Sequence, residues 1–408
     1  MPISKTLTPN EINLIGNGIQ NCGASCFFNS AIQMLFHIPE FREFIIAHKY
    51  LFINNNIIFN LIQLFKKMKE GKKIDTEDNI TSSKTLRQLY DDIQLNYFNS
   101  GNSQQDAGEL LMYLINGSLN NNEDSITKSL NNQVIINNKN INDDKYFQEY
   151  NINLPLYDFI IKSKTNKKCI NNKPLIKNDE IVTYSAFITS EFINNKNLSL
   201  QDTNSVLENV KDQCIGSDLM NETIKYFPKK YVIIQVRREY YDKVNKITKI
   251  NYEPITNYNK DLSINDTNGN RYNLIGTICK AGEPGGGHWW YHHKINNIWY
   301  EYNDSSTTPN SEPSSDSIIY ALFRKDNAKY SYVVYNTINS LIHTIFTNAV
   351  IYINNYDVKK STKIKEYINI LAYYTNVYNK GLKSEYNSQL VRIRTYFITK
   401  IKALLLTI

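Results

Sequence analysis

The chain of 408 residues can bury a large core, since 41% of its residues are hydrophobic and 12% are aromatic. This composition excludes a protein that is disordered throughout. The formal net charge of +7 comes from lysines that are scattered along the chain. Because no basic cluster stands out, charge gives no reason to expect nucleic-acid binding.

Five cysteines, an odd number spread thinly over the chain, indicate free thiols and not a disulfide framework. The start of the chain has no signal-peptide pattern, and no stretch reaches the roughly 18 consecutive apolar residues that a membrane-spanning helix needs. We therefore expect a protein of a reducing compartment, cytoplasmic or nuclear, with no membrane span. The bias toward Asn, Ile, Lys and Tyr is typical of AT-rich genomes, such as those of some large DNA viruses and some protists.

The first predicted helix follows a polar leader, residues 1–11, and a turn-forming stretch that ends at Ser25. Apolar residues recur at helical spacing between Phe28 and Phe36. Cys26 is therefore expected at a helix N-terminus, where unpaired N–H groups and the helix dipole stabilise a thiolate. Such a thiol is a candidate nucleophile. The alternative is a small core residue, since free cysteine is among the most buried residue types.

Asn21 lies five residues before Cys26, on the turn that approaches the helix. A side-chain amide at this place can donate to the charge that develops on a carbonyl oxygen beside the thiol. Asn21 is therefore a candidate oxyanion donor. A plain turn residue is the alternative in a chain that is rich in asparagine.

Further helices are expected before residue 118. One begins after Pro39, and residues 51–69 have the apolar periodicity of another. A third begins at a capping pair, Ser103 and Asp106, and ends near Gly117. Much later, the run Tyr231–Val236 is almost continuously apolar, which is typical of a strand that is buried on both faces.

A glycine-rich stretch, AGEPGGG, precedes a predicted strand that begins at His288. A two-residue turn at Asn296 and Asn297 leads into the paired strand, which ends at Asn303 and Asp304. His288 can then reach across a cleft as a general base, while a carboxamide or carboxylate of the paired strand fixes its tautomer. The alternative is a histidine that is packed among tryptophans and has no chemical role.

Two neighbours of His288 compete with the assigned residues. His292 shares a strand face with His288 in the period-two pattern, but it lacks the glycine loop, so we do not expect it to be the base. Cys279 lies near the loop, where a small buried strand residue is expected and not a reactive thiol.

Three stretches together resemble the ubiquitin-specific proteases, a papain-like family of deubiquitinating enzymes. GIQNCGASCFFNSAIQ at 18–33 is similar to the cysteine box of that family, and QQDAGEL at 104–110 is similar to its second box. The pair HW at 288–289, followed by WYEYNDS at 299–305, is similar to its histidine box. The resemblance covers roughly residues 12–326. It implies an α+β, papain-like fold with a helical thumb, a β-rich palm and fingers.

The resemblance also implies roles for the residues of the catalytic centre. Cys26 would be the nucleophile, and His288 would be the general base and acid. Asn303 matches the residue that orients the histidine, and Asp304 could share that role. Asn21 matches the oxyanion position.

The substrate contacts implied by the resemblance lie on both sides of the thiol. The acidic residue at the position of Asp106 faces the basic, extended ubiquitin tail in the family, and Gln105, Gly287 and Trp289 are further candidates. Two residues depart from the family pattern: Trp289 replaces a tyrosine or phenylalanine, and Glu239 stands where phenylalanine is usual.

Outside these boxes the resemblance is weaker. The fingers would lie within 119–197, but Cys169 and Cys214 each lack a second cysteine two residues away, so we expect no zinc. Residues 198–210 are similar to a short strand and helix of the family. Residues 327–408 are expected to form a C-terminal helical extension.

The sequence therefore predicts a thiol-dependent deubiquitinase that hydrolyses the isopeptide bond after the C-terminal glycine of ubiquitin, with no cofactor. Its partners would be ubiquitin and ubiquitinated proteins. Two alternatives stay open, a catalytically inactive ubiquitin-binding module and a protease for another ubiquitin-like modifier.

Overall fold

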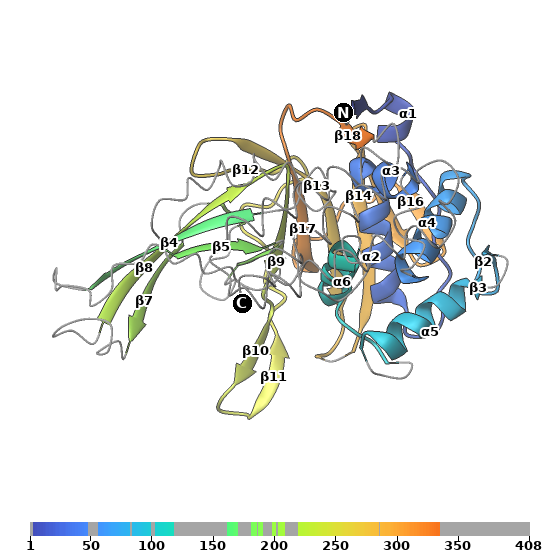
Figure 1. Cartoon of the computed structure of the whole chain (residues 1–408). Helices are drawn as coiled ribbons and strands as arrows, with labels where there is room; N and C mark the ends of the chain where they lie inside the picture. Colours follow the sequence, from blue (N-terminus) through green and yellow to red (C-terminus); the bar gives the residue numbers. More distant parts are fainter. Residues whose placement is uncertain are drawn as a thin grey trace, which may run out of the picture.

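The helices gather at the right of Figure 1, and strands β4, β5, β7 and β8 lie at the left. The computed structural model describes residues 3–47, 56–81, 84–98, 103–117, 161–169, 181–185, 187–190, 198–200, 203–208, 219–284 and 286–334. These ranges contain the stretches around Cys26 and His288. Within them, no helix is long and apolar enough to cross a membrane.

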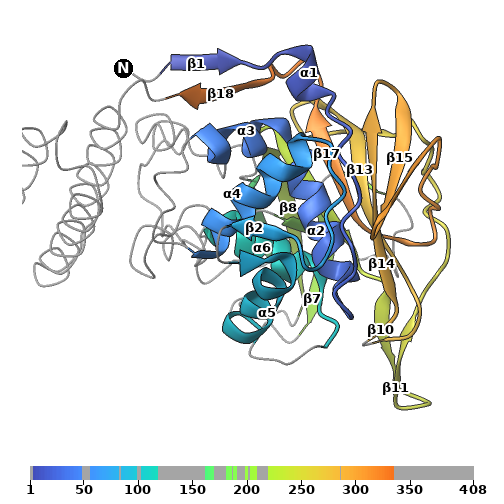
Figure 2. The same cartoon turned by 90° about the vertical axis from the view of Figure 1, so that its right-hand side faces the viewer.

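The larger helices gather on one side of the main sheet, and α2 lies at their centre (Figures 1 and 2). All residues of α2 are buried, and α2 packs against both α6 and strand β14. The helix expected within 51–69 is confirmed from residue 56 onward, and residues 51–55 lie outside the described residues. The helices are α1 Pro9–Ile12, α2 Cys26–Phe36, α3 Pro39–Ala47, α4 Asn56–Lys69, α5 Leu86–Asn96 and α6 Ala107–Gly117.

The main sheet has eight strands in the order β16-β15-β14-β13-β17-β9-β6, with β12 paired to β13. The strand expected over Tyr231–Val236 is confirmed as β9, which lies between β17 and β6. Asn296 and Asn297 both have positive φ, as a two-residue hairpin turn requires, and they connect β14 to β15. The strands are β6 Phe187–Ser190, β9 Tyr231–Val236, β12 Ser263–Asn265, β13 Arg271–Ala281, β14 His288–Ile295, β15 Ile298–Asn303, β16 Ser306–Pro309 and β17 Ile318–Lys325.

A second sheet, of four strands, extends away from the helices in the order β5-β4-β8-β7 (Figure 1). Its strands are β4 Ile161–Cys169, β5 Ile181–Ser185, β7 Thr203–Glu208 and β8 Leu219–Pro228. The helix expected within 198–210 is wrong, because the backbone of β7 pairs along its whole length with β8.

Cys169, the last residue of β4, is disulfide-bonded. Cys22, Cys26 and Cys279 are free. The zinc-free fingers remain a prediction, since Cys214 and most of residues 119–197 lie outside the described residues.

Three small pairs of strands complete the fold. The hairpin of β10 (Glu239–Asp242) and β11 (Ile247–Ile250) projects from the rest of the molecule (Figures 1 and 2). Strand β2 (Asn79–Thr81) pairs with β3 (Lys84–Thr85) near α5. At the N-terminus, β1 (Ile3–Thr6) pairs with β18 (Ser331–Val334).

The pairing of β1 with β18 changes the expected ends of the domain. The polar leader contributes a strand and the start of α1, where Thr8 and Glu11 form a capping box. Part of the expected helical extension, Ser331–Val334, is a strand, and residues 335–408 lie outside the described residues.

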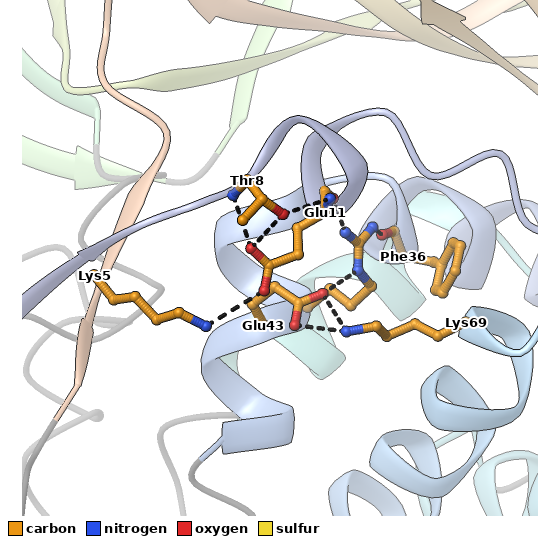
Figure 3. A network of polar contacts seen from close by, with 7 residues as sticks. Lys5, Thr8, Glu11, Phe36, Glu43 and Lys69 are labelled. Carbon is orange, nitrogen blue, oxygen red and sulfur yellow. Dashed lines mark hydrogen bonds and ion pairs between the residues drawn. The ribbon is translucent and has the colours of Figure 1, made fainter.

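A buried ionic network holds the end of α2 (Figure 3). The Arg42 guanidinium donates to the carbonyl of Phe36 at 2.7 Å and to the carbonyl of Glu11. It also contacts Glu43 at 2.9 Å, and Lys69 of α4 bonds the same carboxylate. Because a buried charge is costly unless it is paired, this network fixes α3, α4 and the end of α2 relative to one another.

Candidate active site

Cys26 is the first residue of α2, as the sequence predicted. Its thiol is free and 4% exposed. The turn before it is held by Ser25, whose Oγ accepts from the Cys22 backbone N–H at 2.6 Å. The sulfur therefore lies at the N-terminus of a buried helix, which is the positive end of the helix dipole.

His288 is the first residue of β14, the strand against which α2 packs. Its ring interacts with Cys26, and its Nε2 lies 2.7 Å from Asn303 Oδ1. Asn303 ends β15, which pairs with β14. The structure therefore brings Cys26, His288 and Asn303 together in the order that the sequence analysis assigned.

The contact with Cys26 is the main reason that the pKa of His288 is raised to about 9, and the Asn303 bond contributes in the same direction. Partial burial opposes this shift by penalising the charged ring. At neutral pH the imidazole is therefore protonated beside the sulfur.

Asp304 faces the nucleophile segment instead of the imidazole. Its carboxylate accepts from Asn21 Nδ2 at 2.9 Å and from Asn29 Nδ2 at 2.7 Å, and its backbone carbonyl accepts from the Ile19 N–H at 2.7 Å. Asn303 alone bonds the ring, so the shared orienting role expected for Asp304 is wrong in these contacts. The charge of Asp304 still raises the pKa of His288 from a distance.

The close approach of the Asp304 turn requires a glycine in the opposing segment. A Cβ on Gly18 would lie 2.4 Å from the Asp304 carbonyl oxygen and 2.3 Å from the carbonyl carbon of Ser305. Asp304 itself has a φ of 48°, which an aspartate tolerates better than most residues.

Asn21 is held at both ends of its carboxamide. Its Oδ1 accepts from the Gly23 N–H at 2.8 Å and from Ser25 Oγ at 3.2 Å, while its Nδ2 donates to Asp304. One Nδ2 hydrogen is engaged by Asp304, and a carboxamide has a second one. The side chain is therefore oriented in advance beside the start of α2.

Gln104 is a site residue that the sequence analysis did not single out. Its Nε2 donates to the Cys26 sulfur at 3.1 Å and to the Gly287 carbonyl at 2.5 Å. It connects the nucleophile to the loop before His288. Its position in QQDAGEL could have indicated this role, but the sequence-based prediction named the neighbouring Gln105 instead. Gln105 instead donates to Ser103 Oγ at 2.7 Å.

Asp106 immediately precedes α6 and caps it, because its Oδ1 accepts from the N–H groups of Gly108 at 2.7 Å and Glu109 at 3.1 Å. The cap expected from Ser103 is therefore wrong. Asp106 also accepts from the Tyr320 hydroxyl at 2.6 Å.

A pocket of about 310 Å³ lies beside this carboxylate. It is lined by residues from β9, β10, β11, β13 and β14 as well as by Asp106, so two predicted substrate positions, Asp106 and Trp289, meet in it. Lys280 joins them, with its Nζ 5.1 Å from the Trp289 ring centre and 3.0 Å from a Glu239 carboxylate oxygen.

Gly287 lies at the turn into β14. It has a φ of 97°, and an added Cβ would be 2.2 Å from the Ala281 carbonyl oxygen. No other residue fits this conformation without strain.

The competing residues are core residues, as expected. His292 is buried, and its ring contacts Trp290 at 2.9 Å and the Ser311 carbonyl at 3.1 Å. Cys279 is fully buried, which raises the pKa of its thiol to about 12. Within the described part of the chain, no group of three or more His, Cys, Asp or Glu could hold a metal ion.

A second histidine pair lies between α2 and β14. His37, just after α2, and His293 of β14 have ring centres 4.8 Å apart, and both are buried. Burial lowers the pKa of His37 to about 3 and holds that of His293 well below its ordinary value. Both rings are therefore neutral in the folded protein.

Comparisons with known proteins identify the family of the chain. A family model described as "Ubiquitin carboxyl-terminal hydrolase" matches residues 17–379, a range that continues past residue 326. "Ubiquitin carboxyl-terminal hydrolase 46" of Caenorhabditis elegans is 33% identical over 123 residues, or 28% of this chain and 27% of the relative. The match thus spans about a quarter of that relative's length.

Two solved structures share the fold at low sequence identity. The Ubp8-Sgf11-Sgf73-Sus1 SAGA DUB module gives a TM-score of 0.51 at 13% identity, covering 80% of this chain and 70% of the other. The same module bound to ubiquitin aldehyde gives a TM-score of 0.50 at 16% identity, covering 78% of this chain and 71% of the other. They support the α+β, papain-like fold. The family match over residues 17–379, which is more than half of the chain, shows that the chain belongs to the ubiquitin carboxyl-terminal hydrolase family.

Proposed function

We propose that this protein is a thiol-dependent deubiquitinase that hydrolyses the isopeptide bond after the C-terminal glycine of ubiquitin. The observation that carries the proposal is the His288 ring, which interacts with Cys26 and lies 2.7 Å from Asn303 Oδ1. In a member of this family, that arrangement supports nucleophilic catalysis by Cys26 with His288 as acid and base.

The first half of the reaction begins from a thiolate beside a protonated imidazole. Cys26 Sγ attacks the carbonyl carbon of the terminal glycine and forms a tetrahedral oxyanion. Backbone N–H groups at the start of α2 and the free Nδ2 hydrogen of Asn21 stabilise that charge. His288 gives its proton to the leaving lysine amine, and the C–N bond breaks to leave a thioester.

The second half returns the enzyme to its starting state. The neutral imidazole of His288 takes a proton from a water molecule, which attacks the thioester carbonyl. The C–S bond breaks, ubiquitin leaves with a free carboxylate, and the thiolate is again paired with the imidazolium. Asn303 keeps the ring oriented in both halves.

The Asp106 carboxylate is the group that we expect to meet the basic, extended tail of ubiquitin. It lines the pocket together with Glu239, whose carboxylate is paired with Lys280, and with Arg237 and Arg238. Ubiquitin and ubiquitinated proteins are therefore the proposed partners.

The proposal can be tested with ubiquitin that carries a thiol-reactive group at its C-terminus. One covalent adduct is expected, at Cys26, and the Cys26→Ala variant should form none. Cys279→Ala is the matched control, because its thiol is fully buried, and it should react like the unmodified chain.

Three results would replace the proposal. Binding of ubiquitin with no adduct would favour the inactive binding module. An adduct that forms only with another ubiquitin-like modifier would change the substrate, and an adduct at Cys279 would overturn the site.

A further inference from the structure

Exposed apolar side chains gather on the β10–β11 hairpin. Among the described residues, five of the nine exposed large apolar side chains lie between residues 240 and 252. Val244 at the tip is 90% exposed, Tyr241 is 59% exposed and Ile247 is 50% exposed. Isolated apolar residues on a surface are ordinary, but a cluster of them marks an interaction site.

The root of this hairpin is firmly held. Arg238, just before β10, donates to the carbonyls of Asn251 at 2.8 Å and Glu253 at 3.0 Å, both just after β11. It also donates to the Ile318 carbonyl of β17 at 2.8 Å. The Tyr252 hydroxyl accepts from the Gly282 N–H at 2.9 Å. A hairpin oriented in advance loses little conformational entropy when a partner binds.

The two faces of the hairpin differ in what they adjoin. Directly paired residues of antiparallel strands point to the same face, so Glu239 with Ile250 and Tyr241 with Thr248 share one face. Glu239 and Ile250 also line the pocket beside Asp106. Tyr241 therefore extends the wall of the pocket outward.

The opposite face is separate from the pocket. It carries Tyr240 and Ile247, with an ion pair of 2.6 Å between Lys249 and Asp242. It offers exposed apolar residues of the same kind without continuity to the pocket.

We propose that the Tyr241 face of the hairpin, together with Val244, is a docking surface for the folded body of the ubiquitin whose tail enters the pocket. This rests on the proposed function. A tail that leaves the pocket past Glu239 and Ile250 brings the domain to which it belongs over Tyr241. The partner surface is apolar, since Tyr241 is 59% and Val244 90% exposed and the Glu239 carboxylate at the border of the patch is paired with Lys280. Exposed aromatic residues next to a pocket are typical binding hot spots.

The test compares two double variants that change the same kinds of residue on the two faces. In Tyr241→Ser with Val244→Ser, the KM for a ubiquitin substrate with a fluorogenic C-terminal amide should rise about tenfold or more, because a hot spot is lost. Its kcat should stay within about twofold, since no group near Cys26 changes. In Tyr240→Ser with Ile247→Ser, both constants should stay within about twofold.

The outcomes separate this inference from the proposed function. If the unmodified chain neither binds nor cleaves ubiquitin, the proposed function fails and the docking surface fails with it. If the unmodified chain cleaves ubiquitin and the Tyr241 variant keeps its KM, only the docking surface fails. Equal effects of both double variants on KM would also overturn the docking surface. A dimer in light scattering that only the Tyr241 variant disrupts would overturn it too, because a second copy of the chain would then occupy the surface.

Discussion

Side chains are held differently in two regions of the molecule. One region is the junction of α2 with β14 and β15, and the other is the β10–β11 hairpin. At the junction, Cys26, His288 and Asn303 have partners from within the chain, and α2 is buried along its whole length. On the hairpin, only the root is bonded to the body, and Tyr241 and Val244 face solvent. The comparison indicates that the proposed catalytic groups are held by contacts within the chain, while the proposed docking surface is left exposed.

Acid should break the junction first. His37 and His293 are neutral in the folded state because burial lowers their pKa, whereas in the unfolded chain they bind protons below about pH 6.5. Folding stability is therefore complete above that pH and is lost as the pH falls below it. The expected loss is about 1.4 kcal/mol per pH unit for each histidine between pH 6 and pH 4. Urea unfolding at several pH values measures it.

The matched variant for the acid prediction is His37→Phe, which keeps a ring of similar size and removes one titrating group. Its free energy of unfolding should fall less steeply as the pH decreases, because unfolding then takes up about one proton fewer. Parallel pH curves for the two proteins would show that His37 takes no part.

Removing the charge of Asp304 should loosen the nucleophile side of the junction. In Asp304→Asn, one of the amides of Asn21 and Asn29 would face another amide N–H group and lose its acceptor. We expect kcat/KM to fall about a hundredfold, in the range seen when an oxyanion donor is displaced. Asparagine tolerates the positive φ of this position, so the backbone should remain in place.

Asp326→Asn is the control for that change, since it alters an exposed turn next to another residue of positive φ, Asn327. Its activity on the ubiquitin substrate should stay within about twofold. A similar loss in both variants would mean that Asp304 acts through general stability and not through Asn21.

Most of the junction could be predicted from the sequence, because it depends on local patterns. The helix start at Cys26, the strand start at His288 and the turn at Asn296 each follow from the residues within a few positions. The contacts of Gln104 and Asp304 could not be predicted, since they join segments far apart in the chain. β7 was missed because its pairing with β8, and not local propensity, determines its structure.

Changing Asn303 should move the alkaline limit of activity. The reaction needs a protonated His288, whose pKa is raised to about 9, so kcat/KM should decline as the pH rises through that value. Asn303→Ala removes a bond that raises the pKa of His288, so the alkaline limit of activity should shift to lower pH. At pH 8, kcat/KM should fall about tenfold. Asn303→Asp places a negative charge beside the ring and should shift the limit the other way. If the alkaline limits of these two variants do not move in opposite directions, the proposal that Asn303 orients the His288 ring is contradicted.

The smallest expected effect tests the contact that joins the two sides of the site. Gln104 donates to the Cys26 sulfur, and such a bond stabilises a thiolate, so Gln104→Ala should lower the rate of Cys26 alkylation by iodoacetamide at pH 7 about threefold. Gln88→Ala, the same change at the start of α5, should leave the rate as it is. Mass spectrometry at Cys26 measures both rates. A faster reaction in Gln104→Ala would mean that the Gln104 carboxamide shields the sulfur from small reagents more than it stabilises charge on it. The junction would then be closed to small reagents before substrate binds.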